Sequence, residues 1–184
     1  MKNIAITGKA GAGKDTLAQA LGVSHGHLPR ALAAPIKDFV RRVFDIPHDV
    51  LYGPSELRNL PRPELGGAAP RVALQKLGTE WARSFDPGVW VKLLLREAAC
   101  LNEGGFPICV TDVRFENEAR LLHKAGFLLI EVRRQGPSEE EWRDHASEAG
   151  IGSASCLLSH VFLNYGTLEE FHQNIDAWAK GALG

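Results

Sequence analysis

The sequence GKAGAGK at residues 8–14 fits the phosphate-loop pattern G-x-x-x-x-G-K. It directly follows an apolar run at residues 3–7, which predicts a buried strand, and directly precedes a helical run at residues 16–21. In this context glycines let successive backbone N–H groups turn inward around a polyphosphate, and the helix N-terminus adds a partial positive charge. A turn that only joined a strand to a helix would not need a lysine at residue 14. We therefore expect this loop to bind the phosphates of ATP, with Lys14 reaching the outer ones.

The residue after the loop lysine departs from the usual pattern. That pattern continues with Ser or Thr, whose hydroxyl binds Mg²⁺, whereas here Asp15 occupies the position and Thr16 follows it. A carboxylate is a good oxygen ligand for Mg²⁺, directly or through water. Asp15 is therefore a candidate metal ligand, and the sequence leaves open which side chain contacts the ion.

Further short apolar runs alternate with helical patterns and predict buried parallel strands. These runs lie at residues 106–111, 127–132 and 160–164. A strand–helix alternation of this kind predicts an α/β fold, here a P-loop NTPase three-layer sandwich with a mainly parallel central sheet.

The helical segments carry recognisable ends. Pro35 and Pro87 suit first helical positions, a shorter helix is expected at residues 117–125, and Thr167 with Glu170 forms a capping box before the terminal helix. In the helix after Pro35, the spacing of the apolar residues predicts one buried stripe. The stripe consists of Ile36, Phe39, Val40, Val43 and Phe44.

Two stretches interrupt this rhythm. Residues 51–70 are rich in Pro and Gly and predict a mobile surface loop. Residues 133–159 are polar and begin with paired arginines, which is typical of a lid over an anionic ligand.

Composition and charge narrow the class of protein. The chain has 184 residues, 45% of them hydrophobic, and carries 21 Lys and Arg against 22 Asp and Glu, so no global electrostatic field favours stable nucleic-acid binding.

Three cysteines without a C-x-x-C pair argue against a disulfide framework or a structural zinc site. No apolar run is long enough to span a membrane, and the phosphate loop leaves no room for a signal peptide. We expect a cytoplasmic protein.

A second acidic position follows the next confident strand. Asp112 directly follows the apolar run at residues 106–111. A carboxylate at the carboxyl edge of a parallel sheet would lie beside the phosphate loop, where it can support a metal ion. The alternative is an aspartate that caps the next helix. Arg114 can clamp a phosphate or pair with Glu116 or Glu118.

Cations elsewhere are candidates for charge compensation during phosphoryl transfer. Arg133, Arg134 and Arg143 belong to the expected lid, and the alternative for each is a solvated side chain. Four further cations lie on helices predicted between the first two confident strands. They belong either to an acceptor-binding lobe or to solvated helix faces. These residues are Lys37, Arg41, Arg71 and Arg83. Trp90 belongs either to the core or to a base-stacking surface.

Several segments together resemble the phage-type deoxynucleoside monophosphate kinases, within the nucleoside monophosphate kinase group of P-loop proteins. The likeness spans nearly the whole chain, and Asp after the loop lysine is a habit of that family. The segments are GKAGAGKDT at 8–16, APIK at 34–37, LQKLGTE at 74–80 with Asp86, Trp90 and Val91, TDVRFENE at 111–118, HASE at 145–148 and NYGTLEE at 164–170.

The resemblance implies transfer of the γ-phosphoryl group of ATP to a deoxynucleoside monophosphate, with Mg²⁺. By that likeness Asp15 and Asp112 would serve the metal, and Lys14, Asp112, Arg114 and Arg133 would be catalytic. ATP would bind to Gly11, Ala12, Gly13, Lys14, Asp15 and Thr16, and to Asn164 and Gly166 in an adenine-holding loop. The acceptor would bind to Lys9, Lys37, Arg71, Gly78, Thr79, Trp90, Asp112, Arg114, Glu118 and His145.

The resemblance also implies one domain with lobes, a cytoplasmic location in a bacterial host if a phage encodes the chain, and nucleotides as the binding partners. The core would comprise residues 1–34, 104–132 and 160–184, the acceptor-binding lobe about 35–103, and the lid about 133–159. A homodimer is compatible with these expectations. Three other functions remain open: a P-loop kinase of another phosphorylated metabolite such as phosphomevalonate, a nucleotide-dependent switch or assembly protein, and a binding module without turnover.

Overall fold

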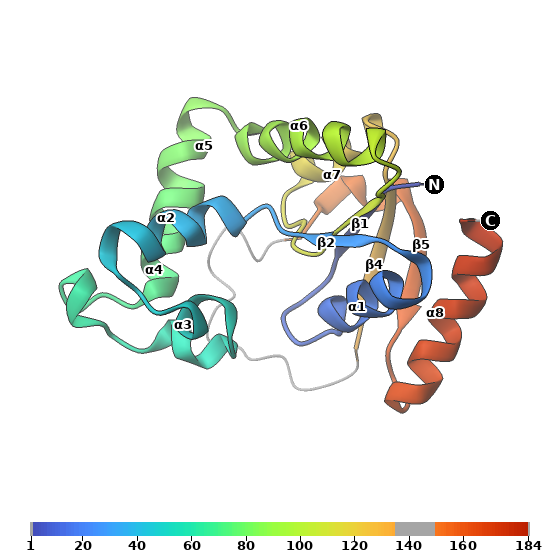
Figure 1. The fold of residues 1–184 in the computed structure, drawn as a ribbon, viewed down its shortest axis with the longest axis horizontal. Helices are drawn as coiled ribbons and strands as arrows, with labels where there is room; N and C mark the ends of the chain where they lie inside the picture. The colour runs from blue at the N-terminus through green and yellow to red at the C-terminus, as the bar shows by residue number, and fades with distance from the viewer. Residues whose placement is uncertain (1, 135–149, 184) are drawn as a thin grey trace. The chain divides into compact units, whose positions relative to one another are not determined.

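The computed structural model describes residues 2–134 and 150–183 and contains a five-stranded parallel sheet (Figure 1). Its strand order is β2-β3-β1-β4-β5, and every neighbouring pair is parallel. The strands are β1 (Ile4–Thr7), β2 (Leu28–Arg30), β3 (Ile108–Val110), β4 (Leu128–Arg133) and β5 (Leu158–Leu163). The predicted α/β class with a mainly parallel sheet is confirmed.

Strand β2 is the element that the sequence pattern missed. It has three residues, and none of them is fully buried. It follows His27 directly and pairs with β3, so that Arg30 lies opposite Val110. An edge strand this short has neither the apolar run nor the alternation that marks a strand in sequence.

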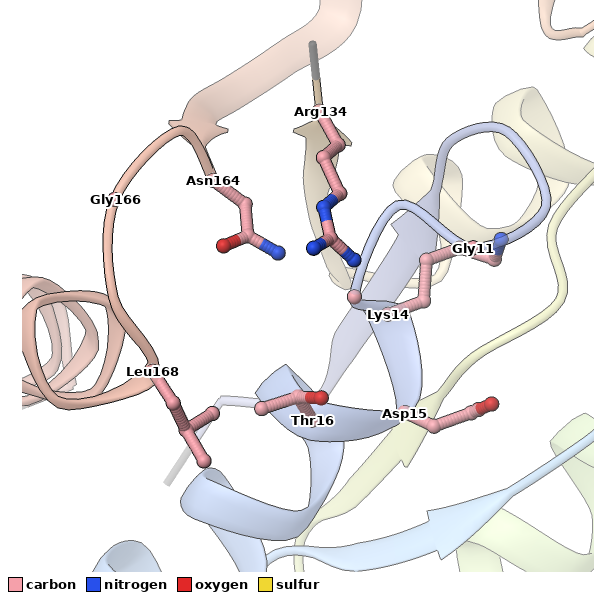
Figure 2. Close-up of a pocket in the computed structure, with 9 residues that line it drawn as sticks. Gly11, Lys14, Asp15, Thr16, Arg134, Asn164, Gly166 and Leu168 are labelled. Atoms are coloured by element: carbon pink, nitrogen blue, oxygen red, sulfur yellow. The ribbon is translucent and has the colours of Figure 1, made fainter. Parts of the chain in front are cut away.

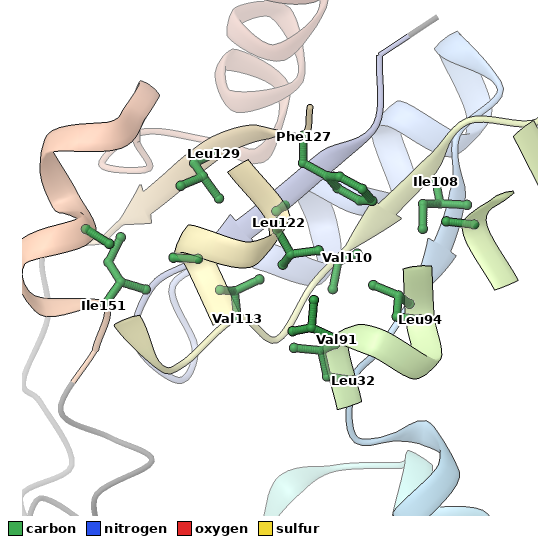
Figure 3. Close-up of a cluster of buried hydrophobic side chains, with 14 residues drawn as sticks. Leu32, Val91, Leu94, Ile108, Val110, Val113, Leu122, Phe127, Leu129 and Ile151 are labelled. Carbon is green, nitrogen blue, oxygen red and sulfur yellow. The ribbon is translucent and has the colours of Figure 1, made fainter. Parts of the chain in front are cut away.

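Helices cover both faces of the sheet, because successive strand residues point to opposite sides. On one face, Ile4 and Ile6 pack with the apolar sides of α1 (Lys14–His25) and α8 (Leu168–Ala182). On the other face, Ala5 packs with residues of α6 (Val89–Glu103), α7 (Glu116–Lys124) and η6 (Gly152–Leu157), in the cluster that Figure 3 shows. The three layers predicted from the sequence are therefore present.

The predicted helix starts at Thr167 and Pro35 are confirmed, whereas α6 begins at Val89, two residues after the start predicted at Pro87. The capping box before α8 is formed, with the Thr167 hydroxyl accepting from the Glu170 N–H at 3.2 Å and the Glu170 carboxylate accepting from the Thr167 N–H at 2.7 Å. Pro35 lies in the first turn of α2 (Ala34–Phe44). No helix within residues 2–134 and 150–183 combines the length and hydrophobicity that a membrane span requires.

Contacts divide the chain into two compact units, one made of Met1–Leu32 with Trp90–Gly184 and the other of Ala33–Val89. The second unit is helical and has a core of its own, built around Val40, Ile46, Val50 and Leu51. Its elements after α2 are α3 (His48–Tyr52), η1 (Ser55–Asn59), η2 (Pro63–Leu65), α4 (Pro70–Gln75), the π-helical segment η3 (Lys76–Trp81) and α5 (Ala82–Phe85).

The structure corrects two predictions in the second unit. Residues 52–69 lie at the surface as predicted, but they form short helical turns rather than an irregular loop. Leu51 before them is fully buried, and Arg58 donates to its carbonyl at 3.0 Å. The Pro and Gly residues that suggested a loop mark the ends of these turns instead. The stripe predicted on α2 is too wide, because Phe39 and Val43 are 49% and 57% exposed. The small core of this unit covers only the side of α2 that carries Ile36 and Val40.

One buried histidine links this fold to pH. His27 is 1% exposed, and its Nε2 lies 3.0 Å from the carbonyl oxygen of Lys2. Burial lowers the pKa of His27, because the charged imidazolium loses its hydration. As the pH falls, the unfolded chain therefore takes up this proton before the folded chain does.

We expect the free energy of unfolding to decrease as the pH falls below about 6.5, the ordinary pKa of histidine. His27→Gln should remove a component of up to about 1.4 kcal/mol per pH unit between that value and the lowered pKa of the folded state. Urea unfolding between pH 5 and 7.5 measures the slope, and His172→Gln, at an exposed position of α8, is the matched control. An unchanged slope in His27→Gln would contradict this account.

Candidate active site

Two glycines of the phosphate loop have a positive φ, and a side chain at either would displace a neighbour. Gly8, at the end of β1, has a φ of +138°, and a Cβ there would lie 2.3 Å from the carbonyl oxygen of Val132 in β4. Gly13, at the N-terminus of α1, has a φ of +106° and the same kind of close contact, with the side chain of Asn164. Ala12 between them is 3% exposed and packs into the core. The loop is thus fixed against the sheet by close approach and by one buried methyl group.

The first turn of α1 begins directly after the loop. Its N-cap residue is Gly13, which has no side chain that could cap the backbone N–H groups of this turn. The ammonium group of Lys14 donates to the carbonyl oxygens of Gly8 at 2.8 Å and Lys9 at 2.7 Å. The N-terminal amides of a helix next to a lysine form a site for a polyphosphate, because both the helix dipole and the ammonium favour negative charge.

Figure 2 shows the pocket that these groups line, which has a volume of about 340 Å³. Three separate segments contribute to it: the phosphate loop with the start of α1, the end of β4, and the segment that joins β5 to α8. The lining residues are Gly11, Gly13, Lys14, Asp15, Thr16, Arg134, Asn164, Gly166 and Leu168. All the predicted ATP-binding residues except the buried Ala12 are therefore brought together.

Leu168 and Arg134 are the two lining residues that the predicted ATP set lacks. Leu168 is the first residue of α8 and is 62% exposed. Its side chain therefore adds an apolar surface at the rim of the pocket. Its position directly after the helix cap Thr167 is the only sequence signal that could have pointed to it. An apolar rim of this kind suits the face of a nucleobase.

Arg133 and Arg134, the first two arginines of the predicted lid, have different surroundings. Arg133 pairs with Glu131 of the same strand at 2.6 Å, and this hydrogen bond raises the pKa of Arg133. Arg134 instead extends toward the phosphate loop and lines the pocket (Figure 2). Arg143 and His145 lie outside the described residues. The two residues differ in their place on the chain, since Arg133 is the last residue of β4 and Arg134 is the first residue beyond it.

Asp112 lies at the carboxyl end of β3, the strand beside β1. Its Oδ1 accepts a hydrogen bond from the backbone N–H of Leu32 at 2.7 Å, and the next residue, Val113, donates to the carbonyl of Ile6 in β1 at 3.2 Å. Asp112 therefore occupies the predicted edge of the sheet. It does not cap α7, whose N-cap is Phe115.

Glu118 caps the start of α7 and is 4% exposed. Its carboxylate accepts from the N–H groups of Arg114 at 3.0 Å and Phe115 at 3.1 Å, and so holds the turn that follows Asp112. Glu116 pairs with Arg120 at 2.8 Å. Arg114 has an exposed side chain. The structure thus gives Glu118 a structural task, and its predicted contact with an acceptor stays a prediction.

These positions also bear on a magnesium ion. Asp15 is exposed in the first turn of α1, Thr16 is half-buried next to it, and both line the pocket. Within the described residues, no group of three or more His, Cys, Asp or Glu side chains gathers around a point. A Mg²⁺ ion that is held by one or two protein oxygens, water and phosphates needs no such group. The oxygens of Asp15 and Thr16 therefore fit a Mg²⁺ ion that arrives with a triphosphate.

Predicted acceptor residues occur in both compact units. Lys9, Trp90, Asp112, Arg114 and Glu118 belong to the first, where Trp90 packs against the core. The other predicted residues of the described chain, Lys37, Arg71, Gly78 and Thr79, belong to the second.

Within the second unit, the ammonium of Lys37 lies 4.7 Å from the ring centre of Tyr52. The Tyr52 hydroxyl donates to Asp38 at 2.9 Å, and burial together with this bond raises the pKa of Tyr52 to about 12. Gly78 packs closely against Ile36 of α2, because a Cβ at Gly78 would lie 2.6 Å from the side chain of Ile36. Gly78 and Thr79 lie in the π-helical segment η3, a type of distortion that is frequent at functional sites.

Two solved structures align with nearly the whole chain at low sequence identity. A sugar kinase from Janibacter sp. HTCC2649 superposes with a TM-score of 0.49 and 12% identity, covering 99% of this chain and 96% of the other. Dephospho-CoA kinase from Campylobacter jejuni superposes with a TM-score of 0.48 and 14% identity, covering 98% and 96%.

Comparison of sequences is more specific. A protein of Acanthamoeba polyphaga mimivirus named "Putative deoxynucleotide monophosphate kinase" is 29% identical over 183 residues, which cover 94% of this chain and 93% of the viral protein. The model of the family described as deoxynucleotide monophosphate kinase matches residues 69–175, more than half of the chain. The chain therefore belongs to the deoxynucleotide monophosphate kinase family and is a phosphotransferase of the nucleotide kinase type.

Proposed function

We propose that this kinase transfers the γ-phosphoryl group of Mg-ATP to a deoxynucleoside monophosphate, producing the diphosphate and ADP. The observation that carries the proposal is the pocket in which Lys14, the uncapped start of α1 and Arg134 converge on one space. The family description and the name of the viral relative support a deoxynucleotide as the acceptor. The pocket supports the triphosphate as the donor.

The proposed reaction requires little covalent chemistry from the protein. An oxygen of the acceptor phosphate forms a bond to the γ-phosphorus, and the bond from that phosphorus to the β-phosphate oxygen breaks, so that ADP leaves with the electron pair. The acceptor phosphate is already largely ionised near neutral pH, so no strong base is needed. Catalysis comes from alignment of the two substrates and from compensation of charge on the migrating group.

The residues of the pocket divide this work. The N–H groups of the loop and of α1 bind the phosphates, Lys14 moves from its two loop carbonyls to the outer phosphate oxygens, and Arg134 adds a second cation. Gly166 and Leu168 contact the nucleoside. A bound Mg²⁺ supplies positive charge to the phosphate oxygens, and Asp15, Thr16 and Asp112 are the residues that we propose hold it.

The unit formed by Ala33–Val89 is the part of the chain to which we assign acceptor binding. Lys37 and Arg71 supply positive charge within this unit. Lys37 has its ammonium placed over Tyr52, and Arg71 donates to the side chain of Asn59 at 2.6 Å. Cations held in defined positions suit the phosphate of a nucleoside monophosphate better than freely moving ones, because less side-chain entropy is lost on binding.

The acceptor requirement is tested by measuring ADP formation from Mg-ATP against dTMP, dGMP, dCMP, dAMP, the four ribonucleotides, phosphomevalonate and a control without acceptor. We expect diphosphate, identified by chromatography, from one or more deoxynucleotides and little ADP without an acceptor. ADP release that is independent of any acceptor would point to a switch or assembly NTPase. Turnover with phosphomevalonate alone would change the acceptor class and keep the kinase chemistry.

Lys14→Ala tests the donor site. We expect kcat to fall by about 100-fold or more, because the substitution removes charge from the transferring phosphoryl group. The fold should persist, since Lys14 contributes no apolar side chain to either core cluster. Lys124→Ala, at an exposed position of α7, is the matched control. Near-normal activity in a folded Lys14→Ala protein would contradict the proposed donor site.

Asp112→Asn tests the second acidic position with little change of shape. The amide oxygen can still accept from Leu32, so the turn after β3 should remain, but the negative charge is lost. We expect activity to fall by about 10- to 100-fold and the Mg²⁺ concentration for half-maximal rate to rise. Steady-state rates across a Mg²⁺ titration measure both effects. A variant with wild-type rate and Mg²⁺ dependence would remove Asp112 from the mechanism.

A further inference from the structure

Asn164 lies where the three segments of the pocket meet. It directly follows β5, and its backbone N–H donates to the carbonyl of Arg133 at 2.8 Å, which extends the pairing of β4 and β5 by one residue. This bond places Asn164 beside Arg134. The same residue begins the segment that continues through Gly166 to Leu168 in the pocket wall.

The side chain of Asn164 reaches the phosphate loop. Its Nδ2 donates to the carbonyl oxygen of Ala12 at 2.9 Å, across 152 positions of the sequence. The same nitrogen lies 2.5 Å from the place where a Cβ of Gly13 would stand. Asn164 therefore holds the 12–13 peptide both by a hydrogen bond and by filling the space beside it.

The geometry of a peptide bond gives this contact a consequence for phosphate binding. In a planar trans peptide the C=O and the following N–H point in opposite directions. A fixed direction for the Ala12 carbonyl therefore fixes the direction of the Gly13 N–H. The methyl group of Ala12 is buried in the core on one side of this peptide. The peptide is therefore held in two ways, by the packing of the Ala12 methyl group and by the hydrogen bond to the Ala12 carbonyl.

We propose that Asn164 is a positioning residue that acts on ATP through the phosphate loop, by fixing the 12–13 peptide in its binding conformation. The resemblance to the kinase family implied only that Asn164 holds the adenine. A positioning role predicts that the loop loses order when Asn164 is replaced, even when no nucleotide is bound. This inference rests on the proposed ATP site and does not depend on which acceptor is used.

Hydrogen exchange of the protein without ligand tests this role, read out by mass spectrometry on peptides that cover residues 8–16. We expect Asn164→Ala to accelerate exchange in this segment, because the peptide loses its fixed carbonyl partner. Asn164→Asp keeps the shape but cannot donate, so it should accelerate exchange as well. Asn174→Ala, at an exposed position of α8, should leave the segment unchanged.

Kinetics provide the second readout in the same variants. We expect the KM for ATP to rise by about fivefold or more in Asn164→Ala, the effect of one lost hydrogen bond, with the KM for the acceptor unchanged. Weaker ATP binding with unchanged exchange at residues 8–16 would overturn the proposal and make Asn164 a direct ligand of the nucleotide. Unchanged exchange together with unchanged KM would also overturn it. Since exchange needs neither nucleotide, a failed acceptor assay would affect the proposed function and leave this test intact.

Discussion

The close approach of the phosphate loop to the sheet is the constraint on which the rest of the site depends. At Gly8 the backbone passes so near the carbonyl of Val132 that even a methyl group would collide with it. This contact fixes where the chain leaves β1, and the buried side chains of Leu17 and Leu21 then fix the direction of α1. The amides at the start of α1 consequently have a defined direction, which is the geometry that a phosphate-binding helix N-terminus requires.

The parallel sheet brings distant parts of the chain to that space. Because all the strands run in one direction, the segments that follow β1, β3, β4 and β5 emerge at the same edge. The phosphate loop, Arg134 and Asn164 are neighbours for this reason, although the sequence separates Ala12 from Asn164 by 152 positions. A phosphoryl-transfer site needs mainly positive charge and alignment, and short segments at a sheet edge can provide both.

Side chains of the same type take different tasks according to their surroundings. Glu118 is buried and accepts from two backbone N–H groups, so it stabilises the turn after Asp112, whereas Glu116 is exposed and pairs with Arg120. Arg133 and Arg134 are adjacent, but only the second lines the pocket. Residue type alone therefore identifies charge that is available to a site, and the packing of each side chain decides whether it is used there.

The sequence by itself determined the phosphate loop, the α/β class, four of the five strands and the capping box at Thr167, because each depends on short-range chemistry: glycine at positive φ, apolar periodicity and caps within one turn. The tertiary structure alone decided the edge strand β2, the helical turns of residues 51–70, the choice of Arg134 over Arg133 and the bond from Asn164 to Ala12. The physical reason is distance along the chain. β2 exists only through its pairing with β3, and Asn164 acts only through its contact with a loop that the sheet carries to it, so no local pattern of residues can encode either.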